Sequence, residues 1–178
     1  MKICVYCSSS NHIPEKYFQV ARDLGKWLAE NGHSVIYGGA SVGLMEEVAK
    51  SFKANNPSGE LIGVIPQKII DMGLTTSLAD EIIKVEDMKE RKEVMRNTGN
   101  GYIALPGSFG TLDEIIEEIV LRQLGYHNKP IVFFDPHQFY SDLYRQFDRF
   151  FSEDFIRTDF SNLYAVTENT SGLRQYFN

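Results

Sequence analysis

The chain has 178 residues, of which 43% are hydrophobic and 24% charged, and its formal net charge is −6 at pH 7. This length suits a domain with a substantial hydrophobic core, and the composition is that of a soluble globular protein. The acidic balance argues against nucleic acid or an anionic membrane as a partner, and no apolar run approaches the roughly 20 residues that cross a bilayer.

The predicted elements alternate between short apolar strands and segments with helical periodicity. The first residues, MKICVYCSSS, become polar too soon for a signal peptide, so we predict a strand there and a cytoplasmic protein. Pro14 and Gly32 fit the two ends of the first helix. A loop of about a dozen residues precedes the fourth strand, and no definite element is assigned after residue 151. The predicted strands are 2–9, 34–39, 61–66, 80–87, 101–107 and 130–135, and the predicted helices are 14–32, 44–54, 88–98, 111–125 and 139–151.

This alternation predicts right-handed crossovers and a parallel sheet that is covered by helices on both faces. Continuously apolar strands, such as PIVFFD at 130–135, agree with burial on both sides. The chain shows no internal repeat, low-complexity segment or linker. We therefore predict one doubly wound, Rossmann-like α/β domain over residues 1–178, in which a ligand binds beyond the carboxyl ends of the strands.

The two cysteines, Cys4 and Cys7, form a C-x-x-C pattern that is also found in redox pairs and half zinc sites. No second cysteine pair exists, and the pattern lies inside the first predicted strand instead of ahead of a helix. We interpret both residues as buried, reduced thiols and expect no metal site, because the spacing of the histidines is not that of metal ligands. These histidines are His12, His33, His127 and His137.

Two glycine-rich loops each join a predicted strand to a predicted helix. They are GGASVGLM at 38–45 and PGSFGT at 106–111. In this context, backbone N–H groups and the positive end of a helix hold a phosphate, and glycine lets the backbone approach it. The alternative is that both loops are simply tight turns. Two such loops favour an anion site, and its expected binding residues are Gly38, Gly39, Gly43, Gly107, Ser108, Phe109, Gly110 and Thr111.

Two familiar nucleotide motifs are not satisfied. Gly38 and Gly43 have the spacing of a P-loop, but Leu44 stands where that motif needs lysine. The pattern Gly99-x-Gly101-x-x-Ala104 precedes its strand, whereas a dinucleotide fingerprint follows one. We therefore expect neither triphosphate hydrolysis nor hydride transfer from a nicotinamide, and no cofactor.

The second loop is followed directly by the carboxylates Asp113 and Glu114. Acidic residues in a first helical turn stabilise the helix, which is the simplest explanation of one of them. A carboxylate beside a phosphate loop also fits a reacting centre that becomes positive, such as ribose C1′ when an N-glycosidic bond breaks. Glycosidases use carboxylates against the same kind of transition state. Since adjacent helical residues point about 100° apart, we expect only one of the two to face the site.

A basic segment, MKERKEVM at 88–95, follows the fourth predicted strand. Arg91 and Lys92 lie near the end of that strand and are candidates for the ligand site. Taken alone, the segment is better explained as a solvated basic face in which Glu90 and Glu93 pair with the basic side chains.

Taken together, GGASVGLM, MKERKEVM, LPGSFGTLDE and QLGYHNKP closely resemble the LOG family of cytokinin riboside 5′-monophosphate phosphoribohydrolases. The likeness extends over about three quarters of the chain, from ICVYCSSS to KPIVFF. It implies a doubly wound α/β homodimer that cleaves a nucleoside 5′-monophosphate, AMP or an N6-modified AMP, into free base and ribose 5-phosphate. Some relatives have been labelled lysine decarboxylases, but we find no pyridoxal-phosphate lysine motif.

The resemblance also implies roles for single residues. Glu114 matches the catalytic glutamate of the family and Arg91 its catalytic arginine. Glu114 is expected to stabilise positive charge at C1′, while Arg91 orients the carboxylate or the substrate and assists departure of the base. The positions expected to contact the nucleotide are Lys92, Gly107, Ser108, Gly110 and Thr111, with Phe109 and Asp113 beside them.

Several positions depart from the family pattern, which keeps a second hypothesis open. This hypothesis is a non-enzymatic module that binds or senses a nucleotide on the same scaffold. The departures are Glu46, Gly73, Asn100, Ser108, Val120 and Leu121. Retention of both Arg91 and Glu114 favours the enzyme, because a binding protein has no evident need for that pair.

The last predicted helix carries an apolar stripe that either covers the sheet or forms a dimer interface. Core packing is the preferred interpretation. The stripe consists of Phe139, Leu143, Phe147, Phe150 and Phe151.

Overall fold

A computed structural model describes residues 1–157 and 162–178 of the chain. Seven parallel strands form one sheet, in the order β4-β3-β2-β1-β5-β6-β7. The order runs outward in both directions from the neighbouring pair β1 and β5, which makes their carboxyl ends the topological switch point. The strands are β1 Lys2–Tyr6, β2 Ser34–Tyr37, β3 Leu61–Pro66, β4 Glu81–Val85, β5 Gly101–Ala104, β6 Ile131–Phe134 and β7 Ala165–Thr167.

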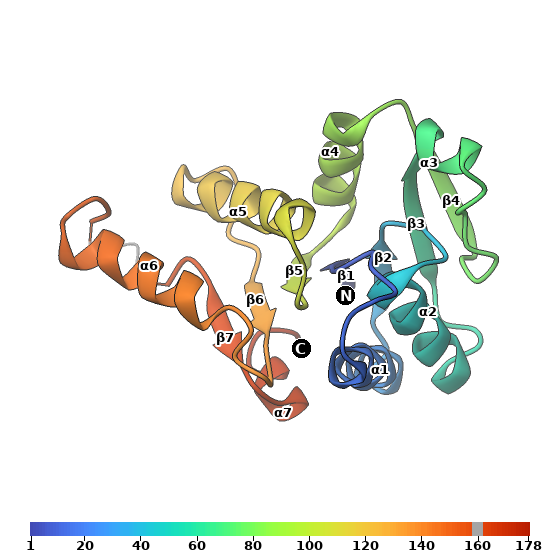
Figure 1. Cartoon of the computed structure of the whole chain (residues 1–178), viewed down its shortest axis with the longest axis horizontal. Helices are drawn as coiled ribbons and strands as arrows, with labels where there is room; N and C mark the ends of the chain where they lie inside the picture. The colour runs from blue at the N-terminus through green and yellow to red at the C-terminus, as the bar shows by residue number, and fades with distance from the viewer. Residues whose placement is uncertain (158–161) are drawn as a thin grey trace.

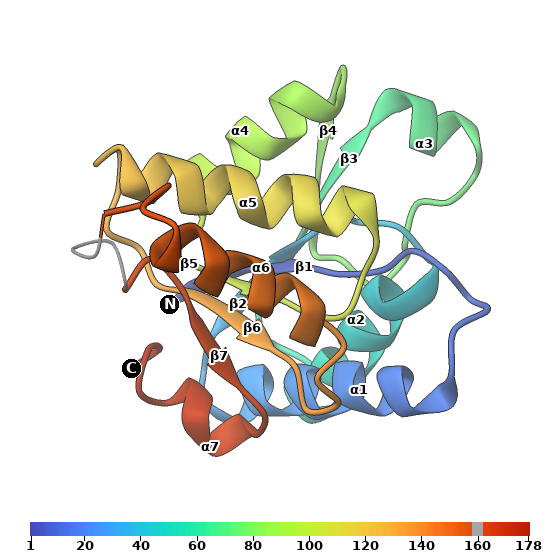
Figure 2. The same cartoon turned by 60° about the vertical axis from the view of Figure 1, so that its left-hand side comes forward.

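Helices cover both faces of the sheet (Figures 1 and 2), so the predicted doubly wound α/β fold is confirmed. Helices α1, α2 and α7 pack on one face, and α4, α5 and α6 pack on the other. The short α3 follows the carboxyl end of β3. The helices are α1 Glu15–Glu30, α2 Gly43–Asn55, α3 Gln67–Asp71, α4 Met88–Thr98, α5 Phe109–Gln123, α6 Ser141–Ser152 and α7 Thr170–Leu173.

Local sequence explains where the helices nearest the switch point begin. The Asp87 side chain accepts hydrogen bonds from the backbone N–H groups of Lys89 and Glu90, and so caps α4. Helix α5 begins at Phe109, two residues earlier than predicted, so Gly110 lies in its first turn. Short elements were missed where periodicity is weak: α3 lies in the segment predicted as a loop, and β7 and α7 lie in the unassigned tail.

The strand β1 is shorter than predicted and ends at Tyr6, so Cys7 lies in the loop that follows it. Both cysteines are free thiols and buried, as expected. In the part of the chain that the structure describes, no helix has the length and hydrophobicity needed to cross a membrane.

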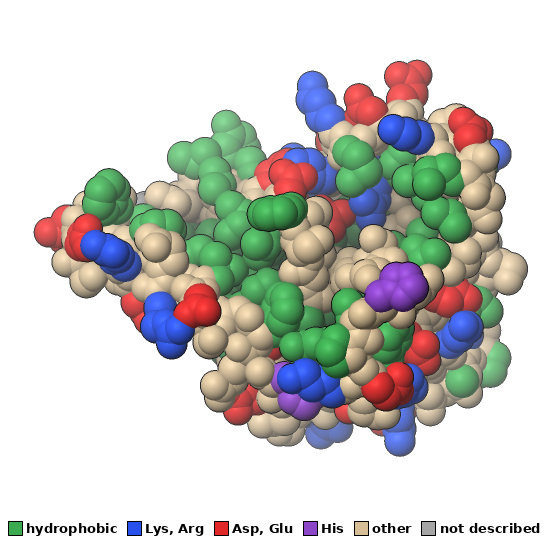
Figure 3. Space-filling view, viewed as in Figure 1, with side chains coloured by type: hydrophobic (Ala, Val, Ile, Leu, Met, Phe, Trp, Pro, Cys, Tyr) green, Lys and Arg blue, Asp and Glu red, His purple; other side chains and the backbone are tan. Residues whose placement is uncertain are grey.

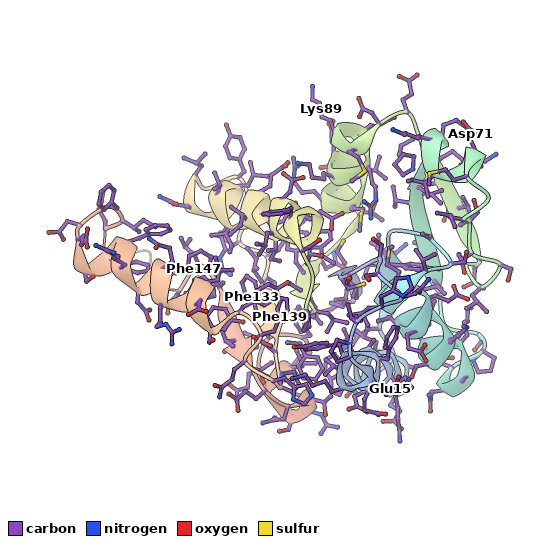
Figure 4. All side chains as sticks on the ribbon, in the orientation of Figure 1. Glu15, Asp71, Lys89, Phe133, Phe139 and Phe147 are labelled. Carbon is purple, nitrogen blue, oxygen red and sulfur yellow. The ribbon has the colours of Figure 1, made fainter. Side chains whose placement is uncertain are left out.

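The apolar stripe of α6 is only partly buried against the sheet. Phe147 is buried, Leu143 and Phe150 are partly buried beside it, and Phe139 is exposed. On the molecular face in Figure 3, hydrophobic side chains gather over α5 and toward α6. Figure 4 shows Phe133 and Phe147 on facing sides of the layer between the sheet and α6. The stripe therefore contributes to the core, as preferred, and leaves apolar surface at its edges.

Candidate active site

A cavity of about 430 Å³ opens at the carboxyl ends of β1, β2, β3 and β5, and includes the switch point. Its walls come from the loops after β1 and β2, the segment from the end of β3 through α3, and the first turns of α4 and α5. Its lining residues are Cys7, Ser8, Ser9, Gly38, Ala40, Val42, Met45, Pro66, Ile69, Met72, Leu74, Met88, Arg91, Ser108, Gly110, Thr111 and Glu114.

A charged pair lies at the inner wall of this cavity. Arg91 Nη1 is 3.0 Å from Glu114 Oε1, and the two side chains are only 12% and 6% exposed. Burial raises the pKa of the Glu114 carboxyl, and the Arg91 charge offsets part of that rise. The guanidinium is fixed from the other side, because its Nε–H donates to the Val64 carbonyl at 3.1 Å. An arginine from α4 and a carboxylate from α5 are thus held together beside the cavity.

The loop after β2 supplies the space for that arginine. A Cβ on Gly38 would lie 2.4 Å from Arg91 Nη2 and 2.5 Å from Met45 Sδ, so a larger residue would displace the end of at least one of these two side chains. Gly39 and Gly43 have φ values of +68° and +57°, which side chains rarely adopt. Gly38 lines the cavity, whereas Gly39 and Gly43 lie behind its surface. The glycines of this loop therefore make room for other parts of the protein.

The loop before α5 is arranged differently. A Cβ on Gly107 would lie 2.1 Å from Thr111 Oγ1, but a Cβ on Gly110 would meet no atom within 4 Å. Ser108 precedes the helix, and its hydroxyl makes no capping hydrogen bond to it. Ser108, Gly110 and Thr111 line the cavity, whereas Phe109 is exposed and points elsewhere. The positive end of the 15-residue α5 therefore opens on the cavity with two hydroxyl-bearing residues beside it.

A tyrosine that sequence reasoning missed braces this loop. The Tyr140 hydroxyl lies 3.0 Å from the Leu105 carbonyl and 3.2 Å from that of Gly107. Buried Asp135 holds Tyr140 in turn, by accepting its backbone N–H at 3.0 Å. No pattern in the sequence marks this contact, because Tyr140 follows a different strand.

Lys92 and Asp113 do not line the cavity. Lys92 Nζ lies 3.0 Å from Asp113 Oδ2 and 2.5 Å from Glu117 Oε2, and the lysine side chain is 16% exposed. Of the adjacent carboxylates Asp113 and Glu114, only Glu114 faces the cavity, as their angular separation on the helix predicts. Among the residues expected at the site, the structure brings together Gly38, Arg91, Ser108, Gly110, Thr111 and Glu114, and places Gly39, Gly43, Lys92, Gly107, Phe109 and Asp113 around them.

Sequence reasoning missed two parts of the cavity wall. One is the polar segment Cys7–Ser8–Ser9, whose position directly after the first strand was an available signal. The other is a largely apolar wall, whose members looked like core residues. That wall consists of Val42, Met45, Pro66, Ile69, Met72, Leu74 and Met88.

Of the positions that depart from the family pattern, only Ser108 lines the cavity. Glu46 Oε2 accepts a hydrogen bond from the Thr76 hydroxyl at 3.1 Å, outside the lining. Asn100 accepts the Lys2 N–H at 2.8 Å, near the opposite end of β1. Gly73 has φ +73° and lies between two lining residues, while Val120 is exposed on α5.

Comparisons with known proteins identify the relatives of this chain. A family model described as "Possible lysine decarboxylase" matches residues 43–177. The chain is 34% identical over 174 residues to cytokinin riboside 5′-monophosphate phosphoribohydrolase LOG5 of Arabidopsis thaliana. That alignment covers 98% of this chain and 75% of the Arabidopsis protein. The chain is 39% identical over 158 residues to cytokinin riboside 5′-monophosphate phosphoribohydrolase LOG of Oryza sativa subsp. japonica. That alignment covers 89% of this chain and 64% of the rice protein.

Among solved structures, the molybdenum cofactor binding protein from Rippkaea orientalis matches with a TM-score of 0.73. The match covers 98% of this chain and 93% of that one, at 19% identity. At that identity the likeness concerns the fold alone.

Proposed function

The chain belongs to the LOG family of cytokinin riboside 5′-monophosphate phosphoribohydrolases, and on that premise we propose that it hydrolyses the N-glycosidic bond of a nucleoside 5′-monophosphate. The products are the free base and ribose 5-phosphate. The observation that carries the proposal is the buried Arg91–Glu114 pair, which lies beside the open N-terminus of α5 in one cavity.

The loop before α5 binds the 5′-phosphate. Backbone N–H groups in the first turn of α5 are free of intrahelical partners and carry the positive end of the helix dipole. The Ser108 and Thr111 side chains add hydroxyl donors, and Gly110 leaves space for the anion to approach. Binding energy at the phosphate, away from the reacting bond, positions C1′ in front of Glu114.

Glu114 acts on the ribose. As the bond between C1′ and the base nitrogen breaks, its electron pair leaves with the base and C1′ becomes positive, so a nearby carboxylate stabilises the transition state. A water oxygen then bonds to C1′, and the proton that it loses is balanced by protonation of the departing base. Arg91 orients the carboxylate through the 3.0 Å contact and assists departure of the base.

The apolar wall opposite the phosphate loop accommodates the base. Met45, Met72 and Met88 line it, and methionine adapts its shape to apolar groups. This wall supports AMP that carries an apolar N6 substituent as a substrate, alongside AMP itself. Lysine decarboxylation is not supported, because no lysine lines the cavity in the described part of the chain, and pyridoxal-phosphate catalysis uses a lysine Schiff base.

The protein also forms a homodimer in this proposal. Large apolar side chains are exposed along and just after α5, namely Val120, Leu124 and Tyr126. A second copy of the chain is the partner that family membership suggests. Leu124→Asp should give a monomer in sedimentation velocity, whereas a dimer that persists in this variant would contradict an interface at α5.

The test of the proposed activity is a chromatographic assay with AMP, isopentenyl-AMP and the matching nucleosides. Wild type should release base from the monophosphates, and Glu114→Gln should lose most turnover while its nucleotide affinity stays within several-fold. Glu60→Gln is the matched control, because Glu60 pairs with Lys2 at the other end of the sheet. Nucleotide binding without base release would support the sensing module instead, and an unchanged rate in Glu114→Gln would remove Glu114 from the mechanism.

A further inference from the structure

A row of ion pairs joins α4 to α5 behind the cavity. It begins with the Arg91–Glu114 contact at the inner wall and continues through Lys92, which touches both Asp113 and Glu117. Two further residues complete the row away from the cavity: Arg96 contacts the same Glu117 and, through Nε at 3.2 Å, Glu118. The helix that carries the arginine and the helix that carries the carboxylate are therefore linked along successive turns.

The end of this row that lies away from the cavity is Glu118, a buried carboxylate that the proposed mechanism does not use. The Glu118 side chain is 1% exposed, and its Oε2 lies 3.2 Å from His127 Nε2. The Lys129 backbone N–H donates to His127 Nδ1 at 3.3 Å, so that nitrogen carries a lone pair. In a neutral imidazole the other nitrogen then carries the proton, so Nε2–H lies near the Glu118 carboxylate, although the two groups are not aligned as a hydrogen bond.

The hydrogen bond from Arg96 Nε fixes one oxygen of Glu118, and His127 lies against the other. A buried carboxylate is costly unless charged or hydrogen-bonding groups surround it, and here Arg96 approaches from α4 and His127 from the loop after α5. Glu114 and Glu118 are four residues apart and share a face of α5. A displacement of Arg96 relative to Glu118 therefore changes the separation of Arg91 and Glu114 one turn away.

We infer that Glu118, held between Arg96 and His127, is a positioning residue that sets the contact between Arg91 and Glu114. It does not line the cavity and touches no reacting atom. Because this inference rests on the proposed function, its test needs one readout in turnover and one that does not depend on activity.

The turnover test compares Glu118→Gln with wild type on a monophosphate that wild type cleaves. The amide keeps the shape but loses the charge that holds Arg96, and since displacements of about 1 Å cost up to 100-fold, we expect kcat to fall about tenfold with KM changed less than about threefold. Arg96→Lys retains a cation and should keep more activity than Arg96→Met. Asp80→Asn is the matched control, because it breaks the 2.6 Å pair with Lys53 outside this row and should lower Tm without lowering kcat.

The second readout is the ¹⁵N–¹H signal of Arg91 Nε, which donates to the Val64 carbonyl in wild type. The signal is assigned with Arg91→Lys. Glu118→Gln should shift or broaden it, and Asp80→Asn should not. If wild type releases no base, the proposed function is wrong. The Arg91 Nε signal in Glu118→Gln then still shows whether Glu118 positions Arg91. An unchanged signal, or a variant with lowered Tm and wild-type kcat, would overturn the inference.

Discussion

The loop after β2 and the loop before α5 have similar compositions and meet at one cavity, yet their glycines make room for different things. At Gly38 the missing Cβ leaves space for the Arg91 guanidinium and the Met45 sulfur. At Gly110 the missing Cβ leaves open space at the positive end of a helix. The first loop therefore admits parts of the protein, and the second is the one that can admit an anion.

A glycine-rich loop therefore does not by itself indicate a phosphate site. The loop after β2 lies against Arg91, and the loop before α5 leads into the helix that carries Glu114. In our proposal the first loop supports the charged groups that act on C1′, and the second holds the phosphate. Substitutions in one loop at a time test whether the first loop affects catalysis and the second affects phosphate binding.

The largest effect is expected for Gly38→Ala. The new methyl group would overlap Arg91 Nη2 and Met45 Sδ, and we expect it to shift the guanidinium from its 3.0 Å contact with Glu114. Because small misplacements of catalytic groups are costly, base release should fall on the order of 100-fold, while nucleotide affinity changes much less. Steady-state kinetics with a binding titration measures both.

The double variant Gly38→Ala/Met45→Ala identifies which contact matters. It relieves the overlap with sulfur and leaves the overlap with the guanidinium, so activity should stay low. Recovery of turnover in the double variant would show that Met45 and not Arg91 requires the glycine.

Gly110→Ala should act on binding instead of on chemistry. Its methyl group meets no protein atom and lies in the first turn of α5, where alanine is a better helix former than glycine. Tm should therefore hold or rise, while KM for the monophosphate rises about tenfold, an effect worth about 1.4 kcal/mol. A variant with unchanged KM would mean that the phosphate lies elsewhere.

The charged side of the cavity has a pH signature of its own. Burial raises the folded-state pKa of Glu114 above its value in the unfolded chain. Such a carboxyl contributes stability that is complete below the unfolded pKa and is lost as pH rises through the folded pKa. Glu114→Gln cannot ionise, so its Tm relative to wild type should increase as pH rises through this window. Calorimetry over a pH series measures this difference in Tm, and a difference that increases as pH falls would contradict the prediction.

The smallest effect is expected for Ser108→Gly, which restores the glycine that the family pattern has at this position. Ser108 lines the cavity, and its hydroxyl does not cap α5. Loss of this hydroxyl as a phosphate donor should raise KM about threefold, since a typical hydrogen bond contributes about 0.5–1.5 kcal/mol net. A lower KM in the variant would show that the serine crowds the anion.

Sequence alone predicted the parallel sheet, the helix α4 to the residue and the loops that carry the site, because apolar periodicity and glycine spacing are local signals. It did not predict α3 or β7, which are short and take their stability from neighbours. It also grouped Lys92 with the ligand site, whereas the structure pairs it with Asp113 and Glu117. Which side chains meet across two helices is a property of packing, and no spacing within one segment encodes it.

The role of Tyr140 could not be predicted from the sequence for the same reason. Its hydroxyl supports the Leu105 and Gly107 carbonyls from a segment about 35 residues later in the chain. The apolar cavity wall was missed for a related reason, since its residues come from separate segments and no single segment marks them as facing a cavity. In both cases the missing information was three-dimensional proximity.

The most direct test of the central claim is the ratio of kcat/KM for a nucleoside 5′-monophosphate to that for the matching nucleoside, measured in wild type and in Gly110→Ala. We predict that wild type prefers the monophosphate by about 100-fold or more, because phosphate binding positions C1′, and that Gly110→Ala reduces this preference. Equal cleavage of nucleoside and monophosphate by wild type would contradict the account.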